Sequence, residues 1–262
     1  MSEMDTLDPE SRMRRLSRRS FLWGGAALAG AYAGWQWLIN RRPDGGVPWP
    51  LRRTLEMNEQ LNRDYFQPAR LSTVYPVSAA GEPRRNGDIG MEEELDPGAW
   101  ALKVEGVAGA PGPITLRMDA IRSLPKVDVV TELRCIEGWS QVVHWSGARL
   151  SDFIAKHPPV TQSGNPARVD RPDDMPEYVG LATPDGGYYV GLDMPAALHP
   201  QTLLCYEMNG QPLTADHGAP LRLVIPVRYG VKNIKRIGTI RYVQQRPPDY
   251  WAEQGYDWYA GL

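Results

Sequence analysis

The chain has 262 residues, 42% of them hydrophobic and 23% charged, which is enough for one large domain or two small ones with a sizeable core. Its formal net charge of -2 lacks the strongly basic balance of nucleic-acid-binding domains, so no nucleic-acid partner is expected. The 24 prolines and 26 glycines, with few long apolar-periodic runs, indicate short strands, turns and short helices.

Residues 1–40 have the pattern of an export signal or of a membrane anchor. Ser17-Arg18-Arg19-Ser20-Phe21-Leu22 matches the twin-arginine motif, in which a receptor reads the arginine pair. The uncharged run from Ser20 to Asn40 is about long enough to span a bilayer, and Ala31-Tyr32-Ala33 offers a cleavage site for a removed signal. A cleaved twin-arginine signal and a retained anchor in the inner membrane both stay open. Either interpretation places the rest of the chain in the periplasm.

The next segments have little periodicity. Residues 41–60 are predicted to form a linker that ends in a short helical stretch. Residues 61–97 alternate Pro, Gly and charged residues, and a loop of that length is either disordered or functional. We expect residues 61–262 to form one domain.

Regular elements are predicted from Trp100 onward. The expected strands cover 100–106, 111–116, 127–135, 177–183, 188–192, 202–208, 220–226 and 234–243, and the expected helices cover 118–124, 149–156 and 194–199. His144, after Cys135, is placed on the following strand or loop. Strands outnumber helices and intermix with them, which predicts an α+β domain with mixed sheets and short helices. The sequence has no glycine-rich nucleotide-binding motif.

The chain has two cysteines, Cys135 and Cys205, and Cys135 ends a predicted strand within TELRCIEGWS. Four interpretations of Cys135 stay open: an inert buried thiol, a disulfide with Cys205, a nucleophile activated by His144, and a single thiolate ligand to a metal that a cofactor completes. The four histidines, at 144, 157, 199 and 217, lack zinc-site spacing, so a metal site made by the protein alone is not expected.

Two stretches resemble a known family. Thr131–Ser140 and YEMNGQPLTADHGAPLRLVIPVRYGVKNIKRIGTI (206–240) are similar, in order and spacing, to the signature of the molybdopterin-dependent oxidoreductases that include sulfite oxidases. Within that family, Arg-Cys-Ile-Glu-Gly-Trp-Ser, Arg-Pro-Pro at 246–248 and the aromatic C-terminal tail resemble the catalytic subunits of periplasmic methionine sulfoxide reductases. The likeness runs from about Asn62 to the C-terminus. It implies a single α+β domain of the sulfite-oxidase type and a molybdenum–molybdopterin cofactor.

The resemblance also implies a set of site residues. Cys135 is the expected thiolate ligand of molybdenum and the catalytic residue. The cofactor contacts carried over from the family are Asn62, Tyr65, Phe66, Thr183, His217, Arg222, Asn233, Ile234 and Lys235. The amides and the lysine of the 233–235 stretch are expected to meet the terminal phosphate. His217 departs from the reductase group, which has asparagine there, and matches the sulfite oxidases. We also expect Trp139 and Trp251 at the substrate mouth.

The activity implied by the resemblance is oxygen-atom transfer, with a sulfoxide as the substrate. Sulfite oxidases place basic residues just after the cysteine, whereas this chain has Glu137. A carboxylate at ~4 Å disfavours a sulfite dianion by on the order of 1–4 kcal/mol. A sulfite-oxidase-like dehydrogenase is the alternative, and an exported binding domain with a Cys135–Cys205 disulfide is a remote one. The sequence carries no haem, flavin or iron–sulfur motif, so a membrane cytochrome b or a soluble cytochrome c is expected to supply electrons.

Overall fold

The computed structural model describes the backbone of residues 9–262 and the side chains of residues 17–262. The first eight residues of the predicted signal segment, and the side chains of Arg12, Arg14 and Arg15, lie outside the described residues. Two compact units are present, Met1–Thr54 and Leu55–Leu262.

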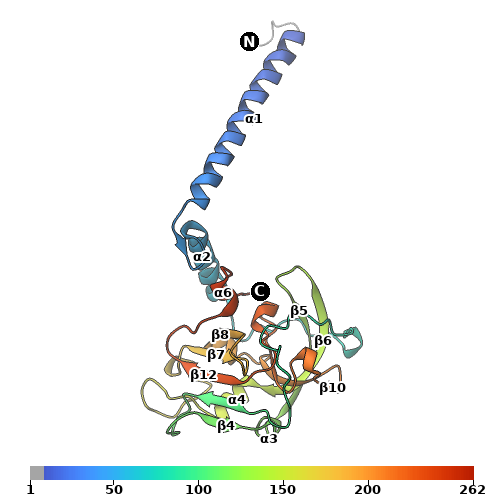
Figure 1. Ribbon diagram of the computed structural model, residues 1–262, viewed down its shortest axis with the longest axis vertical. Helices are drawn as coiled ribbons and strands as arrows, with labels where there is room; N and C mark the ends of the chain where they lie inside the picture. Colours follow the sequence, from blue (N-terminus) through green and yellow to red (C-terminus); the bar gives the residue numbers. More distant parts are fainter. Residues whose placement is uncertain (1–8) are drawn as a thin grey trace. The chain divides into compact units, whose positions relative to one another are not determined.

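The first unit contains the long helix α1 (Pro9–Ile39) and a small antiparallel pair, β1 (Pro43–Asp44) with β2 (Val47–Pro48) (Figure 1). Large apolar side chains along α1 are exposed, among them Phe21, Trp23 and Trp35. Within residues 9–262, no helix combines the length and the apolar character needed to cross a membrane.

Helix α2 (Trp49–Tyr65) replaces most of the predicted linker. Its 17 residues exceed the short helical stretch expected there. Pro50 lies in the first turn, where a helix tolerates proline because that N–H has no intrahelical partner. Further along, the Glu59 carboxylate pairs with Arg63 at 2.9 Å, and Gln60 donates to Asp64 at 2.8 Å. These pairs, four residues apart, stabilise the helix.

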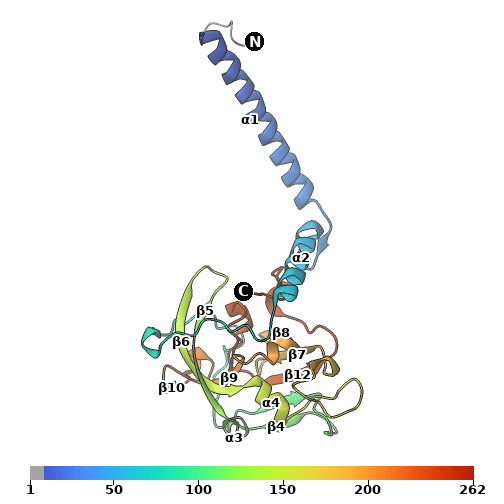
Figure 2. The ribbon, with the colours of Figure 1, turned by 180° about the vertical axis from the view of Figure 1, so that it is seen from behind.

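The second unit is built on two five-stranded sheets. The first sheet has the order β10-β9-β6-β5, with β11 paired to β9; its strands are β5 (Lys126–Arg134), β6 (Ser140–Arg149), β9 (Leu203–Met208), β10 (Gln211–Pro212) and β11 (Arg222–Val224). The second sheet has the order β4-β3-β12-β7-β8; its strands are β3 (Leu102–Glu105), β4 (Ile114–Leu116), β7 (Tyr178–Ala182), β8 (Tyr189–Asp193) and β12 (Thr239–Val243). Strand β12 runs parallel to β3 and antiparallel to β7, so this sheet is mixed. In Figures 1 and 2 the β5–β6 ribbon and the β7–β8–β12 group stand on opposite sides of this unit.

Short helices connect the strands. They are α3 (Met118–Arg122), α4 (Leu150–Lys156), α5 (Met194–Ala197) and α6 (Tyr250–Glu253), together with the 3-10 turns η2 (Val77–Ala79), η3 (Pro172–Asp174), η4 (Ala215–His217) and η5 (Gly230–Lys232). The main core takes Leu102 and Ile240 from one sheet, Leu204 and Leu223 from the other, and Phe153 from α4. One core shared by both sheets confirms the predicted single α+β domain.

The predicted strands and helices are found, with local differences. The strand expected over 220–226 is limited to β11, and the one expected over 234–243 begins only at Thr239. The reason is Arg236, whose φ of +49° breaks the extended backbone. Residues 140–149 form β6, the strand that pairs with both β5 and β9. Helix α6 was not predicted.

Gly147 lies where β6 passes closest to β9. The register of this pair shifts between Ser146 and Gly147, as in a β-bulge. A Cβ at position 147 would lie only 2.7 Å from the Cα of Cys205. A backbone atom cannot move aside as a flexible side chain can, so only glycine fits.

We predict that Gly147→Ala lowers the free energy of unfolding by about 1–3 kcal/mol, because an added methyl overpacks the sheet. Gly112→Ala is the matched control: a Cβ there meets nothing within 4 Å, so a change within about 0.5 kcal/mol is expected. Urea unfolding of both variants measures the difference. Equal stability of the two would contradict this account of the β6–β9 contact.

Candidate active site

Cys135 is presented by the tight loop that joins β5 to β6. The Cys135 amide donates to the carbonyl of Trp139 at 2.9 Å, and the Gly138 amide donates to the carbonyl of Cys135 at 3.1 Å. Gly138 has a φ of +87°, which glycine adopts at no steric cost. The loop therefore holds Cys135 at a defined position just past the end of a ladder of nine paired residues.

The thiol lies in a poorly solvated place. Cys135 is 8% exposed, and the side-chain amide of Asn86 lies 3.7 Å from its sulfur. Burial raises the pKa of Cys135 above that of an ordinary thiol, and the Glu137 carboxylate raises it further against the opposing effect of nearby backbone amides. His144, the candidate activating base, bonds instead to the Asp128 carboxylate at 3.0 Å. The thiol thus lacks the adjacent cation of a preactivated nucleophile, and a bound metal is what would favour the thiolate.

Both cysteines are free thiols. Cys205 lies within β9 opposite Arg222, and its sulfur donates to the carbonyl of Glu207 at 3.1 Å. Burial raises the pKa of Cys205 to about 12. The disulfide required by the remote alternative is not formed, because Cys205 is enclosed in the sheet core and bonded locally.

A cavity of about 200 Å³ opens beside Cys135. Its walls come from the 86–89 segment, the Cys135 loop, the η5 turn and the α6 region. Besides Cys135 its lining includes Asn86, Gly87, Ile89, Leu133, Ile136, Glu137, Trp139, Tyr188, Arg222, Gly230, Val231, Asn233, Lys235, Trp251 and Tyr256. Trp139 and Trp251, expected at the substrate mouth, both lie in this wall.

One end of the cavity carries a buried arginine that has no carboxylate partner among residues 17–262. Arg222 is 4% exposed, and its guanidinium donates to the carbonyls of His217 at 3.2 Å and Asn233 at 3.3 Å. Its Nε has no hydrogen-bond partner among the described residues. Burial lowers the pKa of Arg222 to about 10. A buried cation of this kind is expensive unless an anion neutralises it.

Lys235 lies at the same end. Its ammonium donates to the carbonyls of Asn86, Gly87 and Asp216. Burial, together with repulsion from Arg222 and Arg85, lowers the pKa of Lys235 to about 8. Two cations that repel each other across a partly enclosed space form a site for a polyanion such as a phosphate, which arginine binds through paired hydrogen bonds and lysine as a point charge.

His217 adjoins this end. A small cavity next to the first shares Asn86, Arg222 and Lys235 with it and is also lined by His217. Burial and the two neighbouring cations lower the pKa of His217. These effects favour the neutral form of its imidazole.

The structure brings some of the predicted cofactor contacts together and not others. Cys135, Arg222, Asn233 and Lys235 line the one cavity, and His217 adjoins it. Asn62, Tyr65 and Phe66 instead line a separate cavity of about 450 Å³ with Arg228 and Tyr259.

Thr183 and Ile234 are buried outside the cavity walls. The Thr183 hydroxyl bonds to Asp185 and accepts from the amide of Tyr188 at 3.0 Å. Ile234 is part of the hydrophobic core. The amides of Asn233 and Ile234 donate to the carbonyls of Gly230 and Lys232, so the turn itself uses the two amides expected to meet the phosphate.

Asn86 is the site residue that the sequence reasoning missed. It lines the cavity, contacts the Cys135 sulfur and accepts a hydrogen bond from Lys235 through its carbonyl, so it joins the thiol end to the cationic end. The only signal in the sequence is an Asn-Gly pair after two arginines, within a segment that lacks periodicity.

The thiol, the cations and the amides that line the cavity fit a molybdopterin-type group better than a metal held by protein side chains alone. Among residues 17–262, no group of three or more His, Cys, Asp or Glu side chains is arranged to hold a metal. One thiol at one end and two cations without an ion pair among the described residues at the other match a cofactor that brings sulfur ligands for its metal and carries a phosphate.

Comparison with known proteins agrees with a molybdopterin-type cofactor. Residues 89–251 match the family model described as the oxidoreductase molybdopterin binding domain. The chain therefore belongs to the molybdopterin-binding oxidoreductase family, and molybdopterin is its cofactor.

Two of the proteins that the chain is similar to are named as subunits of protein-methionine-sulfoxide reductases. The chain is 36% identical to the putative protein-methionine-sulfoxide reductase subunit YedZ1 of Azospira oryzae, over 95% of this chain and 87% of that protein. It is also 36% identical to the protein-methionine-sulfoxide reductase catalytic subunit MsrP of Xanthomonas campestris, over 59% of this chain and 48% of the relative. The chain thus spans about half the length of the MsrP relative.

A solved structure shows the same fold. The sulfane dehydrogenase SoxCD of Paracoccus pantotrophus aligns with a TM-score of 0.50 at 18% identity, covering 69% of this chain and 47% of that chain. This likeness confirms the sulfite-oxidase-type architecture of the Leu55–Leu262 unit.

We predict that Arg222→Met lowers the molybdenum and pterin content of the purified protein at least about tenfold, because a charge-assisted contact to the phosphate is lost. In cofactor-free protein the same change should alter the free energy of unfolding by less than about 1.5 kcal/mol, since removing an unpaired buried charge offsets the lost hydrogen bonds.

Arg228→Met is the contrasting variant. Arg228 is equally buried but pairs with Asp193 at 3.1 Å, so its loss should lower the free energy of unfolding by about 3 kcal/mol or more. Metal analysis, pterin fluorescence and urea unfolding provide the measurements. An Arg222→Met protein with full cofactor content would contradict the phosphate assignment.

Proposed function

We propose that the protein reduces sulfoxides, with a methionine-sulfoxide-like methyl sulfoxide as the substrate. The observation that carries the proposal is the wall beside Cys135, which is aromatic and apolar and carries a carboxylate in place of a free cation. The names of the YedZ1 and MsrP relatives agree with this substrate class.

The wall is suited to a neutral, sulfur-containing group. Ile136, Trp139, Trp251 and Tyr256 supply apolar and aromatic surface. Aromatic rings make favourable contacts with the sulfur and methyl groups of thioether-like side chains. A methyl sulfoxide has that apolar body and a single polar S=O bond.

The Glu137 carboxylate repels anionic substrates. Its carboxylate lines the cavity and accepts a hydrogen bond from the Trp139 indole at 2.9 Å. Nearby arginines are already engaged: Arg134 bonds Glu132 at 2.8 Å, and Arg84 lies over the Trp139 ring at 4.7 Å. A sulfite dianion would meet the Glu137 carboxylate, and Arg134 is already paired with Glu132, which favours the sulfoxide over the sulfite-oxidase-like alternative.

Each part of the chain has a separate task in this proposal. Bound molybdopterin supplies the molybdenum centre that exchanges an oxygen atom and electrons with the substrate. Cys135 provides the protein's thiolate ligand, Arg222 and Lys235 neutralise the phosphate, and Asn86 orients the thiol. The aromatic wall binds the methyl sulfoxide and excludes water from it.

The reaction consumes two electrons and two protons, converting the sulfoxide to the thioether and one water. Electrons come from a second protein, for which a membrane cytochrome b or a soluble cytochrome c is the proposed donor. We place the reaction in the periplasm, with export by the twin-arginine route and possible retention through residues 1–40, on the strength of the Arg18-Arg19 motif.

We predict that protein purified from a molybdenum-replete bacterial host reduces methionine sulfoxide with a reduced viologen as electron donor. Cys135→Ser should lower this rate at least about a hundredfold while leaving much of the pterin bound, because a hard hydroxyl replaces the polarisable thiolate. Cys205→Ser, which changes a thiol outside the cavity, is the matched control and should affect stability alone.

The same assays distinguish the alternatives. Oxidation of sulfite by the wild-type protein, without reduction of any sulfoxide, would refute the proposal in favour of the dehydrogenase. Wild-type turnover by Cys135→Ser would remove Cys135 from the active site.

A further inference from the structure

The two sides of the cavity beyond Cys135 come from segments that are separate in the sequence. On one side Gly230 and Val231, in the η5 region, lie against the cysteine loop; a Cβ on Gly230 would stand 3.2 Å from the carbonyl of Arg134. On the other side Trp251 and Tyr256 come from α6 and the turn after it. The width of the site depends on how these two segments are held together.

A buried ion pair joins them. Lys232, the last residue of η5, is 1% exposed, and Asp249, the N-cap of α6, is 3% exposed. The Lys232 ammonium donates to the Asp249 carboxylate and to the carbonyl of Gly191, and it lies 4.4 Å from the centre of the Trp258 ring.

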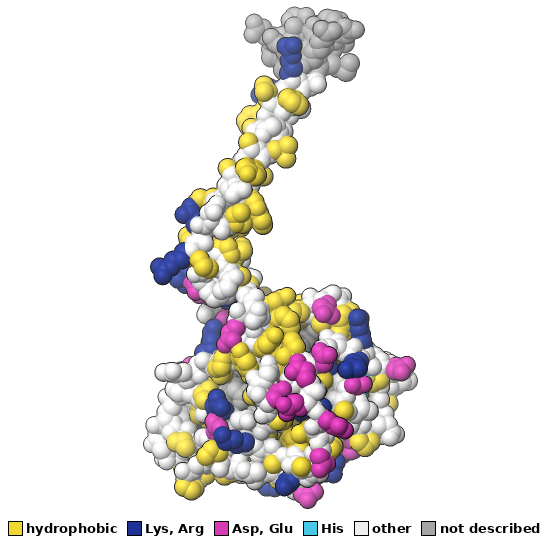
Figure 3. Space-filling view, in the orientation of Figure 1, with side chains coloured by type: hydrophobic (Ala, Val, Ile, Leu, Met, Phe, Trp, Pro, Cys, Tyr) yellow, Lys and Arg dark blue, Asp and Glu magenta, His cyan; other side chains and the backbone are white. Residues whose placement is uncertain are grey.

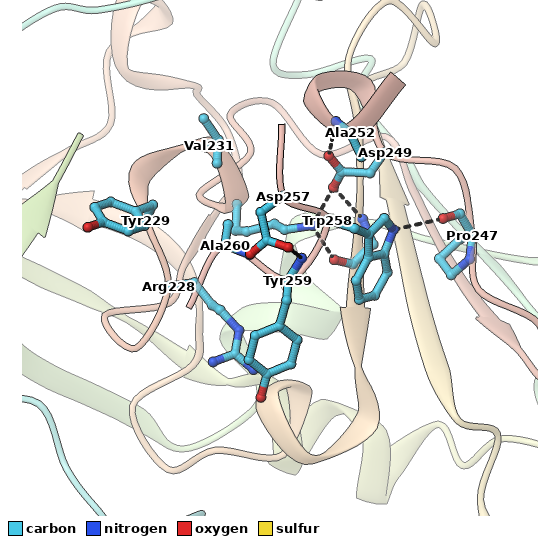
Figure 4. A network of polar contacts seen from close by, with 12 residues as sticks. Arg228, Tyr229, Val231, Pro247, Asp249, Ala252, Asp257, Trp258, Tyr259 and Ala260 are labelled. Carbon is cyan, nitrogen blue, oxygen red and sulfur yellow. Dashed lines mark hydrogen bonds and ion pairs between the residues drawn. The ribbon is translucent and has the colours of Figure 1, made fainter. Parts of the chain in front are cut away.

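Asp249 in turn orients α6. Its second oxygen accepts from the amide of Ala252 at 3.2 Å, and the oxygen that faces Lys232 also accepts from the amide of Gly191 at 3.1 Å. Figure 4 shows Asp249 bonded to Ala252, with the Trp258 indole donating to the carbonyl of Pro247 beside it. One carboxylate therefore caps the helix that carries Trp251 and binds the turn that faces Cys135.

Further hydrogen bonds hold the η5 turn and the C-terminal segment around Tyr259. The Tyr229 amide donates to the carbonyl of Ala260 at 2.9 Å, and the Ala260 amide donates to Asp257 at 2.9 Å. The Tyr188 hydroxyl donates to the carbonyl of Val231. Among these contacts, the Lys232–Asp249 pair is the one that links η5 directly to the start of α6.

A pair this buried is a poor source of net stability. Taking both charges out of water costs most of what their attraction returns, so apolar residues of similar size serve a core as well or better. The fixed directions of the bonds that Lys232 and Asp249 make are what apolar residues cannot reproduce.

We propose that the Lys232–Asp249 pair is a positioning element, which sets the aromatic wall of α6 against the η5 turn and so fixes the width of the substrate cavity. Its effect on substrate binding rests on the sulfoxide reductase function proposed above. Neither residue lines the cavity, so each acts through its neighbours.

The test is the variant Lys232→Met/Asp249→Asn in the full chain with cofactor. Methionine fills most of the space of lysine, and the asparagine oxygen still caps α6, so the variant removes the link and leaves no unpaired charge. Hydrogen–deuterium exchange at residues 229–234 and 250–256 should become at least about threefold faster, because the amide bonds of η5 and α6 lose their common anchor.

Two further measurements report on the active site of the same variant. The visible absorption of the oxidised holoprotein should shift, because the η5 turn lies against the Cys135 loop. The KM for methionine sulfoxide should rise about tenfold while kcat changes less, because the aromatic wall is displaced and the thiolate ligand is retained.

The control is Arg241→Gln/Glu105→Gln, which removes an exposed ion pair of 2.7 Å that joins β12 to β3. It should leave exchange, absorption and KM unchanged. If the double variant at 232 and 249 does not fold, Lys232→Leu/Asp249→Asn, which also leaves no unpaired buried charge, is used for the same exchange measurement.

Exchange at wild-type rates in a folded variant would overturn the positioning inference. Absence of sulfoxide turnover in the wild-type protein would refute the proposed function, and the exchange rates would still decide the role of the pair.

Discussion

A buried arginine and a half-buried lysine at one end of a cavity, neither in an ion pair with a carboxylate among the described residues, are the constraint on which this site depends. Arg222 and Lys235 make hydrogen bonds to backbone carbonyls, which satisfy their donors in part and leave their charge unneutralised. Proteins rarely keep such charges inside unless a ligand completes them. The phosphate of the molybdopterin cofactor is the ligand that we propose for this arrangement.

The chemical character of the cavity wall changes with distance from the two cations. The β5–β6 loop places one thiol beyond the cations, and Asn86 contacts both ends. Past the thiol the wall becomes aromatic and carries Glu137. In the proposed function, the cations of the cavity bind the cofactor, and its apolar, weakly acidic mouth binds a neutral substrate. Figure 3 shows acidic side chains gathered on part of one face of the Leu55–Leu262 unit, consistent with the slightly negative net charge of the chain.

The sequence predicted those features that short, contiguous motifs encode. Cys135 at a strand end, and Arg222, Asn233 and Lys235 within one run of 35 residues, were placed in one site because the family signature fixes their spacing. The strands between Leu102 and Met208, apart from β6, followed from their alternation and turn residues. The mixed sheets followed from the order of these elements.

The features that depend on long-range packing were not predictable from the sequence. Asn86 lies in a segment without periodicity, and only the folded chain shows that it meets Cys135. Asn62 was assigned from a short likeness, but it belongs to the end of α2 and lines another cavity. The Lys232–Asp249 pair spans 17 residues and joins two elements, one of which, α6, has a single turn and no pattern.

A crystal structure of protein purified with its cofactor, with anomalous diffraction recorded at the molybdenum edge, tests the central claim most directly. The account predicts a single molybdenum peak at bonding distance from the sulfur of Cys135, with the cofactor phosphate between Arg222 and Lys235. A molybdenum peak away from Cys135, or a phosphate bound elsewhere with Arg222 still unpaired, would contradict it.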